Sequence, residues 1–387
     1  MLLDYLRGHK QQQFCVTFYL TIYAIFLVMD FLDTTMFKIS WPGSIQIILM
    51  ELLLIFTAIK YLSQDKSSKR EKWLHLLLAT SFVGSAIFSE YIFLLIPLFF
   101  ILGAQNVPFR KLVQIYCIIA GTLMVVTIAG SQLGIVENLI YGNRISLGFN
   151  YPTDFAAHIF FFALAYCYLR KDRLTYIELA GILVLSIFTM IFNHARTNSI
   201  CLFLTFAVFL YLKVRTEVSS RKGTDYKMSP NLSKVLVMSM PICAALIIGL
   251  TFLYNYDPGL PFIRTIDKFL TGRLYWGNLG LEQYGIRLFG STFDMVGAGG
   301  ATAVKEDYFF LDSSYVLLLI RYGIMVFLSV ITVFILSAKR AFAEKDIVLL
   351  WILALISIQC TIEQHLLEMA YNPFLYYLFS SNHQGER

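Results

Sequence analysis

Residues 235–254 read VLVMSMPICAALIIGLTFLY, and no charged side chain occurs among them. About 20 apolar residues in a helix cross the hydrocarbon core of a bilayer, so this segment predicts a transmembrane helix. The next segment, residues 255–312, has the opposite character and mixes arginines and carboxylates with aromatic residues and glycines. This change predicts that the chain leaves the membrane near residue 255 and forms a long polar loop.

The whole chain shows the same contrast. Of its 387 residues, 58% are hydrophobic and 14% are charged, and the mean hydropathy is +0.67. Soluble domains carry about a quarter charged residues. We therefore expect an all-α, polytopic membrane protein with a single membrane domain over residues 1–387. About twelve apolar segments are candidate transmembrane helices: 14–33, 43–61, 74–89, 91–105, 112–131, 154–169, 177–193, 198–212, 235–254, 314–337, 347–361 and 370–380.

The lysines and arginines predict how these helices are oriented. If the N-terminus is cytoplasmic, most of the basic residues fall in cytoplasmic segments, including the loop 213–234, as the positive-inside rule requires. Twelve helices then place both termini in the cytoplasm and the loop 255–312, between the ninth and tenth helices, outside. The same rule accounts for the net charge of +6, so nucleic acid is not expected as a partner.

Four short polar motifs fall on the predicted outer side. Their sequences are NRISLGFNYP at 143–152, HARTN at 194–198, TGRL at 271–274 leading to LFGS at 288–291, and LDSSY at 311–315 followed by RYGI at 321–324. Topology alone does not favour positive charges on this side, so the arginines in these motifs call for another explanation.

Four of the outer arginines are candidate ligands for phosphate: Arg144, Arg196, Arg273 and Arg321. A planar guanidinium offers phosphate two parallel donors, which lysine does not. For any single arginine, a structural ion pair or a side chain extended to the membrane interface is an equal alternative. As a set, they predict an anion-binding site outside the membrane. Metal-ligand spacing is absent among the histidines, cysteines and acidic residues, so we expect no metal and no cofactor.

The order of these motifs resembles the bacterial O-antigen and capsular polysaccharide polymerase (Wzy) family, within the O-antigen polymerase/ligase superfamily. The resemblance rests on R-x-S-x-G-F from Arg144, A-R-T around Arg196, T-G-R ending at Arg273, and L-D-x-S-Y around Asp312 followed by G-I at residues 323–324. Members are similar in helix number and in having one long outer loop near the C-terminal third.

The resemblance implies a GT-C-like, metal-independent glycosyltransferase in the bacterial cytoplasmic membrane. It would transfer a growing glycan from undecaprenyl pyrophosphate to a lipid-linked repeat unit on the outer face. The expected partners are this lipid-linked oligosaccharide, the bilayer and a chain-length regulator protein.

Roles for individual residues follow as hypotheses. The incoming sugar hydroxyl needs a base, for which Asp312 is the first candidate and His194 the second. Asp312 could equally cap the helix that follows it, and His194 could be a hydrogen-bonded structural residue. Tyr315, Arg287 and Glu363 are candidates for the acceptor site.

Two other functions compete with polymerisation. A ligase of the same superfamily would attach the finished glycan to another acceptor, and such ligases tend to carry a histidine near the position of Asp312. A lipid-linked oligosaccharide flippase would place its charges along a central cavity between two similar halves, which this sequence does not show. A sensor or structural membrane protein would not require the outer arginines.

Overall fold

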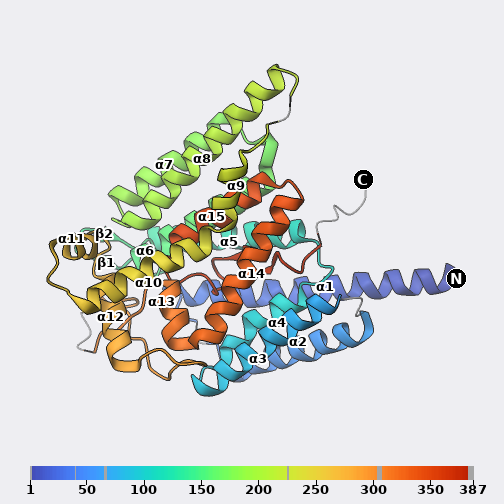
Figure 1. Ribbon diagram of the computed structural model, residues 1–387, viewed down its shortest axis with the longest axis horizontal. Coiled ribbons are helices and arrows are strands. Elements are labelled where there is room, and N and C mark those ends of the chain that lie inside the picture. The colour runs from blue at the N-terminus through green and yellow to red at the C-terminus, as the bar shows by residue number, and fades with distance from the viewer. Residues whose placement is uncertain (1, 40, 65–67, 225, 303–306, 382–387) are drawn as a thin grey trace.

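The computed structural model describes residues 2–39, 41–64, 68–224, 226–302 and 307–381 (Figure 1). Its α-helices are α1 (Leu2–Asp33), α2 (Gly43–Gln64), α3 (Lys69–Phe88), α4 (Leu95–Gly103), α5 (Phe109–Gln132), α6 (Pro152–Arg170), α7 (Tyr176–Ile191), α8 (Arg196–Arg221), α9 (Pro230–Val237), α10 (Ser239–Tyr256), α11 (Pro261–Phe269), α12 (Arg273–Tyr284), α13 (Ser314–Leu317), α14 (Gly323–Ala343) and α15 (Ile347–Gln359). Four shorter helical turns, η1 (Ile92–Leu94), η2 (Lys171–Arg173), η3 (Leu318–Tyr322) and η4 (Pro373–Tyr376), and one antiparallel hairpin of β1 (Ile140–Tyr141) and β2 (Arg144–Ile145) complete the described structure.

Six helical stretches in the described ranges are long and apolar enough to cross a membrane: Gln11–Asp33, Gly43–Lys60, Phe109–Gln132, Arg196–Arg221, Ser239–Tyr256 and Ser314–Ala343. Three shorter apolar helices, Ile92–Gly103, Tyr176–Ile191 and Ile347–Gln359, accompany them. The prediction of a mostly helical chain with long apolar helices is thereby confirmed.

The polar segments lie at two ends of the helical bundle. The hairpin β1–β2 and helices α11 and α12 lie together at the left of Figure 1, which we call the loop end. Basic and acidic side chains from loops predicted to be cytoplasmic gather elsewhere, around a cavity of about 760 Å³ lined by Arg110, Lys171, Lys213 and Asp346. Helix α8 runs from the loop end toward this second group over 26 residues, or about 39 Å at about 1.5 Å per residue.

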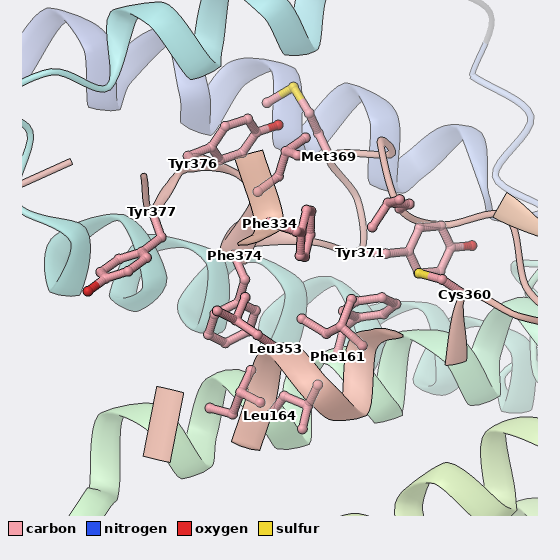
Figure 2. Close-up of a cluster of buried hydrophobic side chains, with 14 of the residues drawn as sticks. Phe161, Leu164, Phe334, Leu353, Cys360, Met369, Tyr371, Phe374, Tyr376 and Tyr377 are labelled. Atoms are coloured by element: carbon pink, nitrogen blue, oxygen red, sulfur yellow. The ribbon is translucent and has the colours of Figure 1, made fainter. Parts of the chain in front are cut away.

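One predicted helix is wrong. Residues 370–380 form turns and the short 3₁₀ helix η4 instead of an α-helix. Asn372–Pro373 explains this, because proline lacks a donor and disfavours a helical residue before it. The segment is nevertheless buried, and Figure 2 shows Tyr371, Phe374 and Tyr376 among side chains from the surrounding helices.

Side chains from distant helices satisfy the backbone of this irregular segment. Asp30 of α1 accepts a hydrogen bond from the Ala370 amide at 2.7 Å. Arg340 of α14 donates through Nη1 to three turn carbonyls, those of Tyr377, Leu378 and Ser380, at 2.9, 2.9 and 2.7 Å. Non-helical backbone is tolerated at membrane depth only where protein groups meet its hydrogen-bonding needs.

The predicted tenth helix is broken in the middle. Residues 314–343 form α13, the π-helical turn η3 and α14, with Gly323 at φ 85°. The LFGS motif lies against the break, since the Ser291 amide donates to the Arg321 carbonyl at 3.1 Å and the Ile324 amide donates to the Arg287 carbonyl at 3.0 Å. A Cβ on Gly290 would lie 2.0 Å from the Arg321 carbonyl oxygen, so only glycine allows this approach.

Candidate active site

A cavity of about 860 Å³ opens at the loop end, and we call it the arginine cavity. Its lining residues fall in the ranges 143–154, 194–197, 269–273, 297–299, 308–312 and 363–365. Parts of all four outer motifs, which lie far apart in the sequence, therefore meet around one space, whereas LFGS at 288–291 and RYGI at 321–324 do not line it. Of the predicted site residues, it brings together Arg144, His194, Arg196, Arg273, Asp312 and Glu363.

Arg273 and Asp312 form an ion pair inside this cavity. Arg273 Nε lies 3.4 Å from Asp312 Oδ2, and both side chains are less than a fifth exposed. Asp267 supports the backbone next to Arg273, because its Oδ1 accepts a hydrogen bond from the Leu274 amide at 2.9 Å at the start of α12. The helix that follows Asp312 begins at Ser314 with Ser313 as its N-cap, so Asp312 contacts Arg273 and does not cap that helix.

Arg144 is held by the hairpin and by the turn before α8. Its Nε donates to the Asn193 carbonyl at 3.1 Å, and its Nη1 donates to the Tyr151 hydroxyl at 3.0 Å. The guanidinium also lies over the Tyr151 ring, 4.9 Å from the centroid. The buried Asn193 side chain donates in turn to the Ile145 carbonyl at 2.6 Å. These contacts leave Arg144 half-buried in the wall of the cavity.

Arg196 and His194 lie at the rim. Both side chains are exposed, and Arg196 is the first residue of α8. His194 adopts a left-handed backbone conformation with φ 47°, which turns the chain between α7 and α8. The start of α8 lines the cavity, and the start of a helix favours an anion.

Two groups in the segment after α15 form the deepest charged part of the cavity. Glu363 and His365 are 5% and 3% exposed. Glu363 Oε1 accepts from Asn198 Nδ2 at 3.3 Å, and Glu363 Oε2 lies 3.8 Å from His365 Nε2. The other imidazole nitrogen, Nδ1, lies 2.7 Å from Glu368 Oε2. His365 also stacks on the Tyr371 ring, with centroids 3.8 Å apart.

The environment shifts the pKa values of these groups. Burial raises the pKa of Glu363 to about 7, against the lowering effect of Arg273 and His365. Burial lowers the pKa of His365, but the neighbouring carboxylates, Glu368 above all, outweigh it and raise that pKa to about 9. Burial also raises the pKa of Asp312 above its ordinary value, and Arg273 opposes this. These shifts favour a charged His365 imidazole beside a Glu363 carboxyl that binds its proton more tightly than an exposed carboxyl does.

Three predicted site residues lie elsewhere. Tyr315 is fully buried and donates its hydroxyl to the Ser357 carbonyl at 2.8 Å, so it is a structural residue. Arg287 is exposed on the loop, outside the residues that line the cavity. Arg321 faces a separate, smaller cavity.

His365 is the main site residue that the sequence interpretation missed. The signal was present, because Glu363, His365 and Glu368 are three ionisable residues within a short break between two apolar stretches. An ionisable group at such a place is a functional candidate by default. Within the described ranges, no group of three or more His, Cys, Asp and Glu side chains has an arrangement that could hold a metal ion.

Comparison of the chain with protein-family models, with curated proteins and with solved structures finds no match in any of the three. The chemistry of the cavity therefore rests on its own geometry. Guanidinium groups, a helix start and an imidazolium suit an anion such as a phosphate ester, and a buried carboxyl suits the removal of a proton.

Proposed function

We propose that this protein is a metal-independent, GT-C-like glycosyltransferase that polymerises a polysaccharide at the outer face of the bacterial cytoplasmic membrane. The donor is a glycan on undecaprenyl pyrophosphate, and the acceptor is a lipid-linked repeat unit. The observation that carries this proposal is the meeting of Arg144, Arg196 and Arg273 with Glu363 and His365 in one cavity at the loop end. The distribution of lysine and arginine supports a loop end that faces outward and cytoplasmic termini.

The reaction needs a proton acceptor for the attacking hydroxyl and stabilisation of the negative charge on the leaving group. An acceptor hydroxyl oxygen attacks this carbon, and the bond from the carbon to the pyrophosphate oxygen breaks. The electron pair leaves with undecaprenyl pyrophosphate, and the hydroxyl proton passes to a base. Arg273, Arg196 and the His365 imidazolium stabilise the charge that grows on the leaving oxygen.

Glu363 is the proposed base. Its pKa of about 7 suits a group that must be ionised to accept a proton at neutral pH and must hold that proton briefly. Asp312 is close to the same space, but its carboxylate already pairs with Arg273 at 3.4 Å. We assign Asp312 the role of positioning the guanidinium.

The direct test uses purified protein, a synthetic undecaprenyl-pyrophosphate-linked repeat unit and EDTA, with products separated on a gel. Wild type should give a ladder of lengths that EDTA does not abolish, and Arg273→Ala should lower the rate by on the order of 10²–10³. Arg264→Ala is the matched control, because Arg264 is another loop arginine but lies outside the cavity lining. Transport of the lipid across liposomes without any elongation would refute the proposal and favour a flippase.

A ligase-type transferase is the second candidate. His365 brings an imidazole to the cavity that contains Asp312. Such ligases are expected to carry a histidine near Asp312 in the sequence, whereas His365 belongs to the segment after α15. Supplying the repeat unit together with an alternative lipid acceptor distinguishes the two functions. A polymerase extends the repeat unit, whereas a ligase transfers it once to the other lipid.

A further inference from the structure

A second cavity of about 280 Å³ lies behind the arginine cavity, and we call it the inner chamber. Its polar lining consists of Asp30, Asp33, Gln46, Arg321 and Glu368. The two spaces share a boundary, because His365 lines the arginine cavity, Glu368 lines the inner chamber, and the two side chains lie 2.7 Å apart.

Arg321 is held in this chamber by aromatic rings. Its guanidinium lies 4.7 Å from the Tyr91 centroid and 5.7 Å from that of Phe293. Its Nε is buried and has no hydrogen-bond partner among the described residues. The broken helix at η3 supports this placement, because π-helical turns often occur where a side chain is redirected for function. Arg321 therefore lines the chamber and carries a donor, Nε, that no described protein group accepts.

The lining suits a ligand that both donates and accepts hydrogen bonds. Carboxylates at Asp30, Asp33 and Glu368 accept, and Arg321 donates. Three carboxylates disfavour a phosphate, and the guanidinium disfavours a simple cation. The hydroxyls of a sugar do both, and Tyr91 and Phe93 line the same space.

An apolar groove lies next to the chamber. The groove, of about 820 Å³, is lined mostly by aliphatic residues of α1, α2 and α5. Met29 lines both the groove and the inner chamber. A glycan carried on a polyprenyl chain can therefore have its lipid in the groove and its sugar residues in the chamber.

We propose that the inner chamber binds the sugars of the lipid-linked acceptor, with its polyprenyl chain in the groove between α1, α2 and α5. This inference rests on the proposed function and assigns the donor and the acceptor to opposite sides of His365. The acceptor hydroxyl reaches the arginine cavity at the His365–Glu368 boundary, attacks the anomeric carbon of the donor and releases its proton to Glu363. Undecaprenyl pyrophosphate leaves with the electron pair of the broken bond.

Testing this needs an acceptor that can be varied without changing the donor. The soluble repeat-unit oligosaccharide, released from its lipid, is supplied in excess over a limiting lipid-linked donor. Arg321→Gln and Asp30→Asn should each raise the half-saturating oligosaccharide concentration by about tenfold or more, because each loses a charge-assisted hydrogen bond. Glu137→Gln, which changes an exposed carboxylate at the loop end, should leave it unchanged.

Binding of undecaprenyl pyrophosphate alone separates the possible outcomes. The two chamber variants should bind it as wild type does, which also shows that they are folded, whereas Arg273→Ala should not. Normal oligosaccharide saturation in both chamber variants would overturn the acceptor assignment. Loss of undecaprenyl pyrophosphate binding in the chamber variants, to the same extent as in Arg273→Ala, would overturn it too, because the chamber would then be part of the donor site. Failure of wild type both to bind this lipid and to elongate would reject the proposed function itself, and the acceptor assignment with it.

A labelling experiment supplies an independent readout. Gln46→Cys introduces a thiol into the chamber lining, and its reaction with a maleimide is compared with that of the unsubstituted protein. The soluble oligosaccharide should slow this reaction at least several-fold, and undecaprenyl pyrophosphate should not. Protection by the lipid alone would contradict the assignment.

Discussion

Asp312 and Glu363 line the same cavity but have different neighbours. Asp312 pairs with Arg273 at 3.4 Å, whereas Glu363 accepts a hydrogen bond from the amide of Asn198 and lies 3.8 Å from His365. Two carboxyls in such different surroundings suit two different roles. The sequence could identify both residues as candidates, but only the contacts distinguish a positioning group from a base.

Replacing each carboxyl by its amide should therefore have unequal effects. Glu363→Gln should lower the elongation rate by on the order of 10²–10⁴, the range for loss of a general base. Asp312→Asn should cost about tenfold, because Arg273 keeps its charge and loses only its orientation. The elongation rates of both variants are measured at saturating substrate across a pH series. A larger loss in Asp312→Asn, together with a changed acid limb, would reverse the assignment.

The pH dependence of wild type follows from the same residues. The rate should rise as the pH passes about 7, because Glu363 must lose its proton to act as a base. It should fall above about 9, because His365 then loses the positive charge that faces the leaving group. A bell-shaped profile with these limbs is the expected result. His365→Gln should remove the alkaline limb, and its persistence in that variant would exclude His365 as the group responsible.

At the scale of elements, the break between α13 and α14 depends on two glycines. Gly290 and Gly323 have φ values of 90° and 85°, and an added Cβ on Gly323 would lie 2.3 Å from the Gly290 nitrogen. Holding a non-glycine residue in such a sparsely populated backbone conformation costs about 1–3 kcal/mol, and the backbone overlap adds to that. The LFGS motif is thus a structural support for Arg321.

Gly290→Ala and Gly323→Ala should each destabilise the folded protein strongly. The expected signs are a lower melting temperature in detergent and loss of the monodisperse peak in size-exclusion chromatography. Gly249→Ala is the matched control, because Gly249 lies within α10 and an added Cβ meets nothing within 4 Å. This control should be neutral or slightly stabilising. Equal stability of all three variants would mean that the two segments do not approach as closely as described.

At the scale of the whole molecule, the long apolar segments could be predicted because hydropathy depends on local sequence alone. The segment 370–380 could not, since its backbone is satisfied by Asp30 and Arg340, which are distant in sequence. The arginines that line the arginine cavity could be predicted as a set of candidate anion ligands. The separation of Arg321 from the others was not, because it depends on how α1, α4 and η3 pack around the inner chamber.

The orientation of the bundle is a prediction that labelling can check. Lys268→Cys in α11 and Lys222→Cys after α8 are both exposed lysine positions at opposite ends of the described structure. A membrane-impermeant maleimide added to intact cells should label the first and not the second. Permeabilised cells should give labelling of both. Labelling of Lys222→Cys alone in intact cells would invert the topology and place the arginine cavity in the cytoplasm.

The central claim is that the arginine cavity transfers a glycan away from undecaprenyl pyrophosphate. The most direct measurement counts the undecaprenyl pyrophosphate released by the purified protein against the repeat units added to the growing chain. We predict equal amounts throughout the reaction, with both quantities falling together in Arg273→Ala. Chain growth without release of this lipid, or release without chain growth, would contradict the mechanism.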